Sequence, residues 1–478
     1  MSKTMKFLQV SGVLASLTLV ITGCNSGSSS GSPAVIDSPQ SRLANCGPGS
    51  RPESGMQGRV SQEDHDTGRA AAGFTCNTEL VGKHIEANTI GTVGGFKVER
   101  YIDSAGNECA FYDSTLLFPS NVLDLNAGVN VLDMSDPTNP TLVNRLVTPA
   151  MDSPHESMVV AQDAGILAAV LGNPTFYPGI VDVYDISDNC LEPALQASAP
   201  VGFLGHESGI SPDGKTFYSA SPGTPTLTAV DISTPFAPAP IWFGDYTSHG
   251  LSISNDGNRA YLSSGNGKGV LILDVSEIQS RQPNPQVREI ASITWPNQSI
   301  PQNAIPFTRN GKPYLLEIDE YSTDNPGEDS SVASHGEFVG AGRIIDISDE
   351  TKPRIVSDLR LEVHEPENRE AIKDDPGASN ITGGYAGHYC DIPTRVDPDI
   401  AACSMILSGL RIFDIRDPEN PREVAYFNAP VLPRIITQPA PASNWAMSKP
   451  AFAPERKEIW YTDGYSGFYV VRVTNDVW

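Results

Sequence analysis

The chain has 478 residues, of which 39% are hydrophobic, enough to bury a substantial core in one large domain or two ordinary ones. Its 57 Asp and Glu residues outnumber its 32 Lys and Arg residues, giving a formal net charge of -25, and no basic stripe interrupts this excess. Such a protein repels phosphate groups, so the composition excludes nucleic acid as a partner.

The N-terminus has the features of a bacterial lipoprotein signal. Two lysines precede an apolar stretch at residues 7–21, which is too short to span a membrane and ends in small residues before Cys24. The sequence Ile-Thr-Gly-Cys resembles a lipobox, in which the cysteine is acylated and becomes the mature N-terminus. We therefore predict a signal peptide at residues 1–23, lipidation at Cys24 and a flexible Gly/Ser-rich tether at residues 24–33. The resemblance implies an exported protein anchored by lipid in the cell envelope, at the periplasmic face or outer surface of the outer membrane, and the alternative is a cleaved, secreted protein.

Residues 34–78 are rich in Gly, Pro and Ser and are predicted to form an irregular N-terminal arm. Apart from Cys24 the chain has six cysteines, an even number that indicates disulfides in an exported protein. Cys390 and Cys403 flank an Asp-Pro turn almost symmetrically, the placement of a cross-strand disulfide in a hairpin. The pairing of the other four stays open: Cys46, Cys76, Cys109 and Cys190.

Residues 79–478 contain one phrase seven times, at spacings of 43 to 72 residues. Each copy joins a β-branched and aliphatic strand to an Asp and then a turn, as in GVNVLDMSDPTNP from residue 128 and GLRIFDIRDPENP from residue 409. We interpret the Asp as a turn residue whose carboxylate accepts backbone N–H groups. The six copies of this residue are Asp133, Asp185, Asp231, Asp274, Asp346 and Asp414, and the seventh copy has Arg472 instead.

A second unit lies between the copies and predicts a hairpin of two strands around an Asp-Gly turn, as in HGLSISNDGNRAYLSSG. Four strands in each of seven repeats predict an all-β protein, a seven-bladed β-propeller of four-stranded blades with an irregular N-terminal arm. The last copy is followed by no outer strand of its own, so residues 79–88 or 91–100 are expected to supply it.

The recurring phrase resembles the LVIVD repeat of exported bacterial and archaeal propellers, and the similarity extends over roughly residues 79–478. The seventh copy departs from the pattern at Arg472. The resemblance implies the propeller architecture and an extracytoplasmic setting. It supplies no catalytic residues.

Histidines recur at one register of the hairpins. His206 and His249 each lie eight residues before the glycine of their turn, and His155 and His388 open the corresponding units of two other blades. The register is held in two further blades by Asn303 and Ser448. Because the first strand of each propeller blade lines the central channel, these side chains are expected to meet at its mouth.

Two interpretations of the histidines stay open. In the structural one, each imidazole bonds the backbone of a neighbouring blade and satisfies a polar group that is costly to bury alone. In the functional one, four neutral imidazoles without a thiol bind a transition metal, namely copper, zinc or iron. Glu156 or Glu207 would then act as a ligand or as a general base.

Two further segments are expected to face solvent. The acidic sequence DEYSTDNPGEDSS from residue 319 lacks the ordered spacing of a calcium loop and is interpreted as a solvated insertion. His335 and His364 lie in or beside the two longest insertions and are expected at the surface.

The sequence thus predicts a lipid-anchored, extracytoplasmic propeller that acts as a binding platform for a protein or a surface glycan. The alternative is a metal-dependent enzyme with its site at the channel mouth. Such an enzyme would resemble the methanethiol oxidases of the selenium-binding protein family, which are propellers with a histidine-bound metal in the channel, by fold analogy only.

Overall fold

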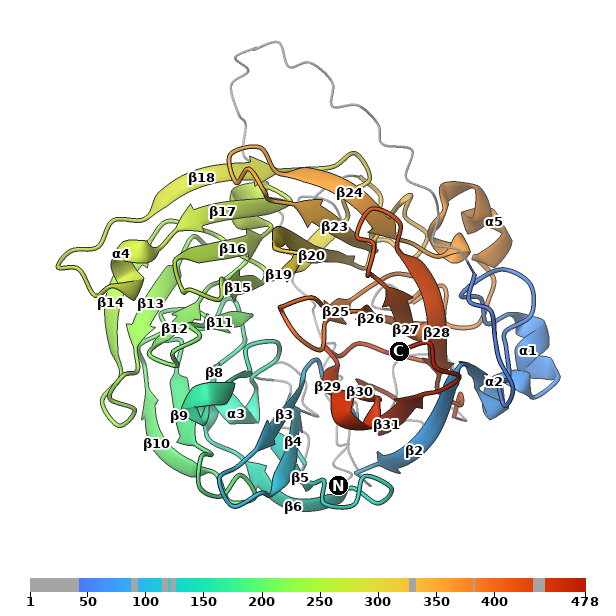
Figure 1. Cartoon of the computed structure of the whole chain (residues 1–478), viewed down its shortest axis with the longest axis horizontal. Coiled ribbons are helices and arrows are strands. Elements are labelled where there is room, and N and C mark those ends of the chain that lie inside the picture. The colour runs from blue at the N-terminus through green and yellow to red at the C-terminus, as the bar shows by residue number, and fades with distance from the viewer. Residues whose placement is uncertain are drawn as a thin grey trace, which may run out of the picture. The chain divides into compact units, whose positions relative to one another are not determined.

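The computed structural model describes residues 43–86, 93–113, 119, 121, 126–325, 332–380, 383–432 and 443–478. Within this part the chain forms seven antiparallel blades around one axis, as Figure 1 shows. The prediction of a seven-bladed β-propeller is therefore confirmed. The predicted signal peptide, Cys24 and the tether lie outside the described residues.

In blades 1 to 4 the four strands follow one another in the chain from the channel outwards. Blade 1 contains β3 (Val98–Ile102), β4 (Glu108–Asp113), β5 (Val129–Asp133) and β6 (Thr141–Leu146). Blade 2 contains β7 (Val159–Ala161), β8 (Ile166–Val170), β9 (Val181–Asp185) and β10 (Ala194–Ala199). Blade 3 contains β11 (Ser208–Ile210), β12 (Thr216–Ser219), β13 (Leu227–Asp231) and β14 (Ala239–Gly244). Blade 4 contains β15 (Leu251–Ile253), β16 (Arg259–Ser263), β17 (Val270–Asp274) and β18 (Arg288–Ile293).

The remaining blades have additions to this plan. Blade 5 contains β19 (Ile300–Arg309), β20 (Lys312–Glu320), β23 (Gly342–Asp346) and β24 (Arg354–Leu359), with the small hairpin β21 (Ser322–Thr323) and β22 (Phe338–Val339) inserted after β20. Blade 6 contains β25 (Tyr389–Asp391), β26 (Ile400–Met405), β27 (Gly409–Asp414), β28 (Arg422–Asn428) and a fifth, outermost strand, β1 (Phe74–Cys76). Blade 7 contains β29 (Ala451–Ala453), β30 (Glu458–Asp463), β31 (Gly467–Val473) and β2 (Thr78–His84).

The repeated phrase is the third strand of each blade, and its Asp is the last residue of that strand in six blades. Each of these carboxylates accepts the backbone N–H two residues further on, at 2.8 to 3.0 Å. This side-chain bond fixes the turn that leads the chain into the fourth strand. The interpretation of the Asp as a turn residue is confirmed.

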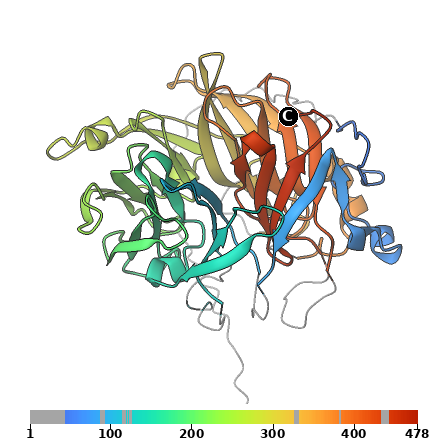
Figure 2. The same ribbon diagram turned by 60° about the horizontal axis from the view of Figure 1, so that its bottom comes forward.

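The seventh blade is closed by the strand β2, whose Glu79 lies directly opposite Arg472 of β31. Figure 2 shows the two strands side by side. Arg472 contacts Glu79 at 2.9 Å and Glu458 at 3.1 Å. Because the fourth strand comes from the other end of the chain, this blade needs no turn after its third strand, and Arg472 replaces the Asp. Of the two expected closing segments, the one beginning at residue 79 is correct, since residues 98–102 form β3 instead.

The hydrophobic core is divided into layers between neighbouring blades. Seven of the buried clusters each combine side chains of two adjacent blades, including the pair formed by blades 7 and 1. Every blade is thereby packed on both faces by aliphatic and aromatic side chains. The ring is closed by packing as well as by β2, and it holds the inner strands at fixed positions around the channel.

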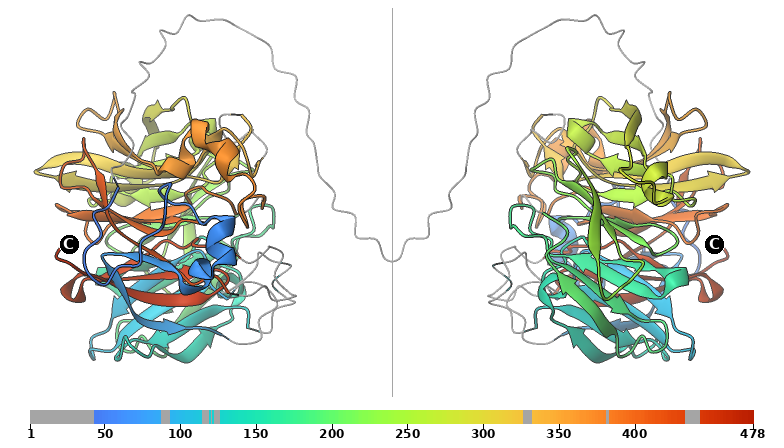
Figure 3. Two further views of the ribbon diagram at one scale, coloured as in Figure 1. Left: turned by 90° about the vertical axis from the view of Figure 1, so that its right-hand side faces the viewer. Right: turned by 90° about the vertical axis from the view of Figure 1, so that its left-hand side faces the viewer.

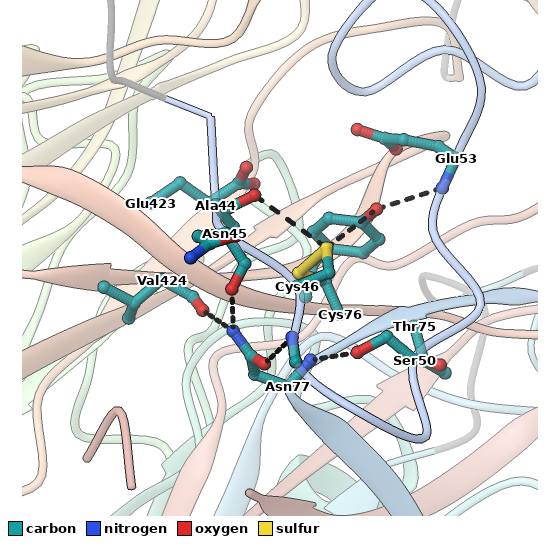
Figure 4. The surroundings of a disulfide bond; sticks show 12 residues. Ala44, Asn45, Cys46, Ser50, Glu53, Thr75, Cys76, Asn77, Glu423 and Val424 are labelled. Atoms are coloured by element: carbon teal, nitrogen blue, oxygen red, sulfur yellow. Dashed lines mark hydrogen bonds between the residues drawn. A yellow bond between two sulfur atoms is a disulfide. The ribbon is translucent and has the colours of Figure 1, made fainter. Parts of the chain in front are cut away.

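Three disulfides join elements of the fold. Cys390 and Cys403 lie directly opposite each other in β25 and β26, as predicted. Cys109 and Cys190 link blades 1 and 2. The third joins Cys46 of the arm to Cys76 at the end of β1, and Figure 4 shows its surroundings.

The described part of the arm packs against the rim of the ring. It contains α1 (Gln62–Asp66), α2 (Arg69–Ala72) and then β1. Figure 3 shows these helices beside α5 (Arg369–Ile372), and Arg59 binds Asp375 at 2.8 Å. The other short helices are α3 (Pro149–Asp152), α4 (Ser276–Gln279), η2 (Gln162–Ala164), η3 (Gly265–Gly267), η4 (Glu362–His364), η5 (Pro366–Asn368) and η6 (Pro454–Arg456). No helix in the described ranges is long and apolar enough to cross a membrane.

His364 corrects one expectation. His335 is exposed, as expected, but His364 is fully buried in η4. Its Nδ1 accepts the backbone N–H of Leu361 at 3.2 Å, and burial lowers its pKa well below the ordinary value. The inserted segment packs into the apolar layer between blades 5 and 6, so this histidine is part of the core and does not face solvent.

Candidate metal centre

Four histidines converge at one mouth of the channel, where the inner strands of their blades begin. His155, His206, His249 and His388 precede β7, β11, β15 and β25 respectively. The ring centres of His155 and His206 are 4.6 Å apart, and those of His206 and His249 are 4.9 Å apart. Their side chains are 16%, 10%, 7% and 0% exposed, so the group is nearly removed from water. The four histidines therefore meet at the mouth of the channel, as their common register predicts.

The carboxylate of Glu156 lies among the four imidazoles. Its Oε2 is 3.3 Å from Nε2 of His206 and 3.7 Å from Nε2 of His249. Its Oε1 is 3.5 Å from Nε2 of His388 and 3.9 Å from Nε2 of His155. The side chain is 2% exposed, which makes Glu156 the shared neighbour of all four rings.

Glu320 completes the cluster, and the sequence did not single it out. It is the last residue of β20, opposite Ile300 of β19, so the strand pairing brings it to the same mouth. Its Oε1 lies 3.4 Å from Nε2 of His249, and its Oε2 lies 2.9 Å from Nε2 of His388. The expectation of a solvated insertion from residue 319 is therefore wrong at its start, because the acidic residues there continue a buried strand. Residues 326–331 of that segment lie outside the described residues.

The preceding residue, Asp319, is buried and fully bonded. It accepts the indole N–H of Trp295 and the backbone N–H of Ser299, both at 3.0 Å. It also pairs with Arg343, whose guanidinium lies 3.9 Å from the ring centre of Trp295. These contacts hold the end of β20 in place and thereby position Glu320.

The outer ring nitrogens of two histidines bond the backbone of a neighbouring blade, the preceding one for His206 and the following one for His388. Nδ1 of His206 lies 3.3 Å from the carbonyl oxygen of Gly172, and Nδ1 of His388 lies 2.6 Å from that of Met447. A carbonyl oxygen can only accept, so Nδ1 donates in both pairs. A neutral imidazole has one N–H, and Nε2 therefore presents its lone pair to the carboxylates. Metal-binding histidines have this arrangement, in which a bond at one nitrogen orients the other.

Burial sets the charge of the cluster. It raises the pKa of Glu156 to about 8, with the neighbouring Glu320 as the next cause, and raises the pKa of Glu320 well above its ordinary value. The same loss of water lowers the pKa of His206 to about 4 and lowers the pKa of His388. At neutral pH the imidazoles are neutral and Glu156 carries a proton when no cation is present.

The backbone is strained on two sides of the cluster. His155 has φ +51° and Tyr321, next to Glu320, has φ +51°, in the left-handed region that side chains of this size rarely adopt. The ring of Phe96 lies edge-on against His155 with centres 4.4 Å apart, and Tyr321 lies 5.6 Å from His388. Half-buried aromatic rings thus border the imidazoles, and the surrounding fold holds His155 itself and the neighbouring Tyr321 in costly conformations.

Glu207 occupies a different layer although it follows a histidine as Glu156 does. It forms an ion pair with Lys97 at 2.9 Å and accepts a hydrogen bond from Asn303. These three residues border a cavity of about 620 Å³ inside the channel, whose lining includes none of the four histidines, Glu156 or Glu320. Glu207 is therefore bound to a lysine between the cluster and the cavity. The other predicted ring residue, Ser448, accepts the backbone N–H of Thr462.

The comparisons with known proteins concern the repeat and the fold. Residues 122–148, which contain the first copy of the phrase, match the LVIVD repeat. Similar solved structures include the hydrazine synthase of Kuenenia stuttgartiensis, with 17% identity over 83% of this chain and 100% of that chain and a TM-score of 0.49. They include the β-propeller domain of Myceliophteria thermophila Cps50 (Swd1), with 12% identity over 82% and 100% and a TM-score of 0.47. A chain of a mitotic checkpoint complex has 10% identity over 83% and 95% and a TM-score of 0.46. No curated protein sequence matches the chain significantly.

Proposed function

We propose that the protein binds a transition metal, copper, zinc or iron, at the mouth of the propeller channel and that this centre carries its activity. His155, His206, His249 and His388 would be ligands, together with Glu156 and Glu320. The observation that supports this most directly is that six donor side chains from five successive blades face one another, five of them buried and His155 half-buried. A metal-dependent function is thus preferred to a purely structural role for the histidines.

The two interpretations of the histidines account for different nitrogens. A structural role explains why Nδ1 of His206 and His388 bonds a neighbouring blade. It does not explain why Nε2 of His388 faces Oε2 of Glu320 at 2.9 Å, or why Oε2 of Glu156 faces Nε2 of His206 at 3.3 Å, in a buried site. In each of these pairs two acceptors face each other, and a proton or a cation must lie between them. A metal ion satisfies all these atoms at once.

The donor set favours a transition metal of intermediate softness. Imidazole suits zinc, copper and iron, while calcium and magnesium prefer sites made of oxygen alone. Thiolates take no part, because the six cysteines among the described residues are paired in disulfides. A bound ion would supply Lewis-acid or redox chemistry. The residues would position it, exclude water and exchange the proton held by Glu156.

Metal analysis of the purified protein, prepared without a histidine tag, tests the proposal. We expect at least about one equivalent of copper, zinc or iron per chain after loading and dialysis. The double variant His206→Ala/His249→Ala is expected to lose most of it, because two of the four imidazoles are removed. His335→Ala is the matched control, since that histidine is exposed and outside the cluster. Less than a tenth of an equivalent in the loaded parent protein would exclude a metal function.

An aromatic patch supports a second function, binding of a protein or a surface glycan. Tyr177, Phe203 and Phe243 are 66%, 42% and 48% exposed. The ring centre of Phe203 lies 5.2 Å from that of Tyr177 and 5.3 Å from that of Phe243. Phe203 has φ +58°, so the fold holds a bulky side chain outward in a strained conformation. Aromatic rings of this kind are typical contact residues.

The patch is tested with an array of bacterial surface glycans and the variant Phe203→Ser/Phe243→Ser. We expect the parent protein to bind at least one array member and the variant to lose tenfold or more of that affinity. A hot-spot residue at the centre of an interface contributes about 2 kcal/mol or more, which is consistent with such a loss. Equal binding by the two proteins would remove the patch as a binding surface.

We also propose that Cys24 is lipidated and anchors the protein outside the cytoplasm. Three disulfides support an oxidising compartment. In a Gram-negative host, the parent protein is expected to sediment with the membrane fraction. The variant Cys24→Ala is expected to move from the membrane fraction to the soluble fraction, because it lacks the acyl chains that form the anchor. Equal distribution of both proteins between the fractions, measured by immunoblot, would argue against the anchor.

A further inference from the structure

We propose that the metal centre binds two metal ions bridged by the carboxylate of Glu156. This inference rests on the proposed function, because it concerns how many ions the same cluster holds. The donor atoms form two groups of three, each with atoms within 4.8 Å of one another. One group is His155, Glu156 and His206, and the other is Glu156, Glu320 and His388. Glu156 is common to both.

The two oxygens of Glu156 face different histidines. Oε2 has His206 as its nearest ring nitrogen, at 3.3 Å, whereas Oε1 has His388, at 3.5 Å. A carboxylate that offers its oxygens in two directions can bind one ion with each. Two-metal sites hold their ions about 3.5–4 Å apart, which a single carboxylate spans.

Glu320 shows the same division. Its Oε1 is directed at His249, at 3.4 Å, and its Oε2 at His388, at 2.9 Å. His249 also lies 3.7 Å from Oε2 of Glu156, so it faces both carboxylates. Each carboxylate therefore has one oxygen nearer His249 and the other nearer His388, while Glu156 alone belongs to both groups of donor atoms.

A single ion surrounded by the four imidazoles fits the cluster less well. In that arrangement the four Nε2 atoms alone would be the ligands, and the Nδ1 atoms behind the rings would bond carboxylates or backbone carbonyls. Here carbonyl oxygens occupy that place behind His206 and His388. The carboxylates lie in front, between the Nε2 atoms, where they are ligands themselves.

The net charge of a two-ion centre indicates the sign of charge that its ligand or substrate carries. Two divalent ions bring four positive charges, and Glu156 and Glu320 bring two negative ones, while the imidazoles are neutral when they bind a metal. The centre would then carry a net charge of two positive units in a buried site. Such a centre favours an anionic ligand or substrate group, as metal ions are the largest local charges in a site.

Copper(II) titration of the metal-free protein distinguishes the outcomes. Native mass spectrometry is expected to show saturation at two ions per chain. The first equivalent is expected to give the spectrum of an isolated ion in electron paramagnetic resonance, and the second to broaden or remove it, because bridged spins couple. Saturation at one ion would overturn the two-ion centre and leave the proposed metal function standing. No uptake would overturn both.

Substitution of the bridge provides the second measurement. Glu156→Gln keeps the size of the side chain but removes one anionic oxygen, so we expect either one bound ion or two ions with uncoupled spectra. Glu320→Gln is the second variant, expected to weaken binding of one ion at least tenfold, and it serves if the first does not fold. His335→Ala is expected to retain two coupled ions. Two coupled ions in Glu156→Gln would overturn the assignment of the bridge.

Discussion

Replacement of Arg343 by methionine is expected to lower the free energy of unfolding by about 3–5 kcal/mol, the range for breaking a buried ion pair. The guanidinium is 1% exposed and contacts the carboxylates of Glu317 and Asp319, which are both fully buried. Methionine fills much of the space but leaves two acids without their cation. Burial already raises the pKa of Glu317 well above its ordinary value, and the loss of Arg343 raises it further.

The sign of the pH dependence follows from that pKa. A carboxyl group with a raised pKa in the folded state binds its proton more tightly there than in the unfolded chain. The variant is therefore expected to come closer to the parent protein in stability as pH falls, and to fall further behind as pH rises. Urea denaturation at several pH values measures this.

Arg354→Met on the same blade is the matched control. That arginine is 59% exposed and binds Asp346 at 2.9 Å, so its loss is expected to cost less than about 1 kcal/mol. An equal effect of the two substitutions would show that the buried network does not stabilise blade 5. Since Asp319 precedes Glu320, we expect Arg343→Met, unlike Arg354→Met, also to weaken metal binding.

Below pH 8, metal affinity is expected to fall about tenfold per pH unit for every proton that the incoming ion displaces. The pKa of Glu156 is raised to about 8 in the metal-free protein, so below this pH an incoming ion must displace a proton. One displaced proton gives a loss of about 100-fold between pH 7 and pH 5. Calorimetric titration with zinc in buffers of different ionisation enthalpy counts the protons released.

Metal affinity is expected to rise with pH, whereas the contribution of Glu156 to the stability of the metal-free protein is expected to fall as pH rises. The raised pKa of Glu156 contributes stability that is complete below its unfolded pKa and is lost as pH rises through about 8. The lowered pKa of His206, to about 4, contributes stability that is present above its unfolded pKa and lost as pH falls towards 4. Metal affinity that is constant from pH 5 to pH 8 would show that no proton is displaced from Glu156.

Much of the fold could be predicted because each copy of the repeat determines its own strand and turn through residues that are close in sequence. Each third strand carries its own β-branched residues and its own turn Asp, so a short stretch of sequence determines both the strand and its end. The convergence of the histidines followed from one register and the symmetry of the ring. Cys390 and Cys403 could be paired because both lie in one hairpin.

The remaining features depend on contacts between distant segments. Glu320 ends an acidic sequence that resembles a solvated loop, and the cation that allows burial beside it, Arg343, lies on another strand of the blade. Glu156 and Glu207 both follow a histidine, yet Lys97 and Asn303 from other blades bind only Glu207. Local sequence could not separate their roles. The pairings of the other four cysteines likewise join residues of separate elements.

The pairing of β2 with β31 determines when the centre can mature. The fourth strand of the last blade comes from the start of the propeller, so during synthesis the ring stays open until the final blade exists. Nδ1 of His388 donates to the carbonyl oxygen of Met447, in the segment that leads into the last blade, so this imidazole gains its orienting bond when that blade is in place. In the proposed centre, a metal ion would therefore be acquired after the last blade has been made. The compartment in which the chain folds would then help to determine which metal the proposed centre binds.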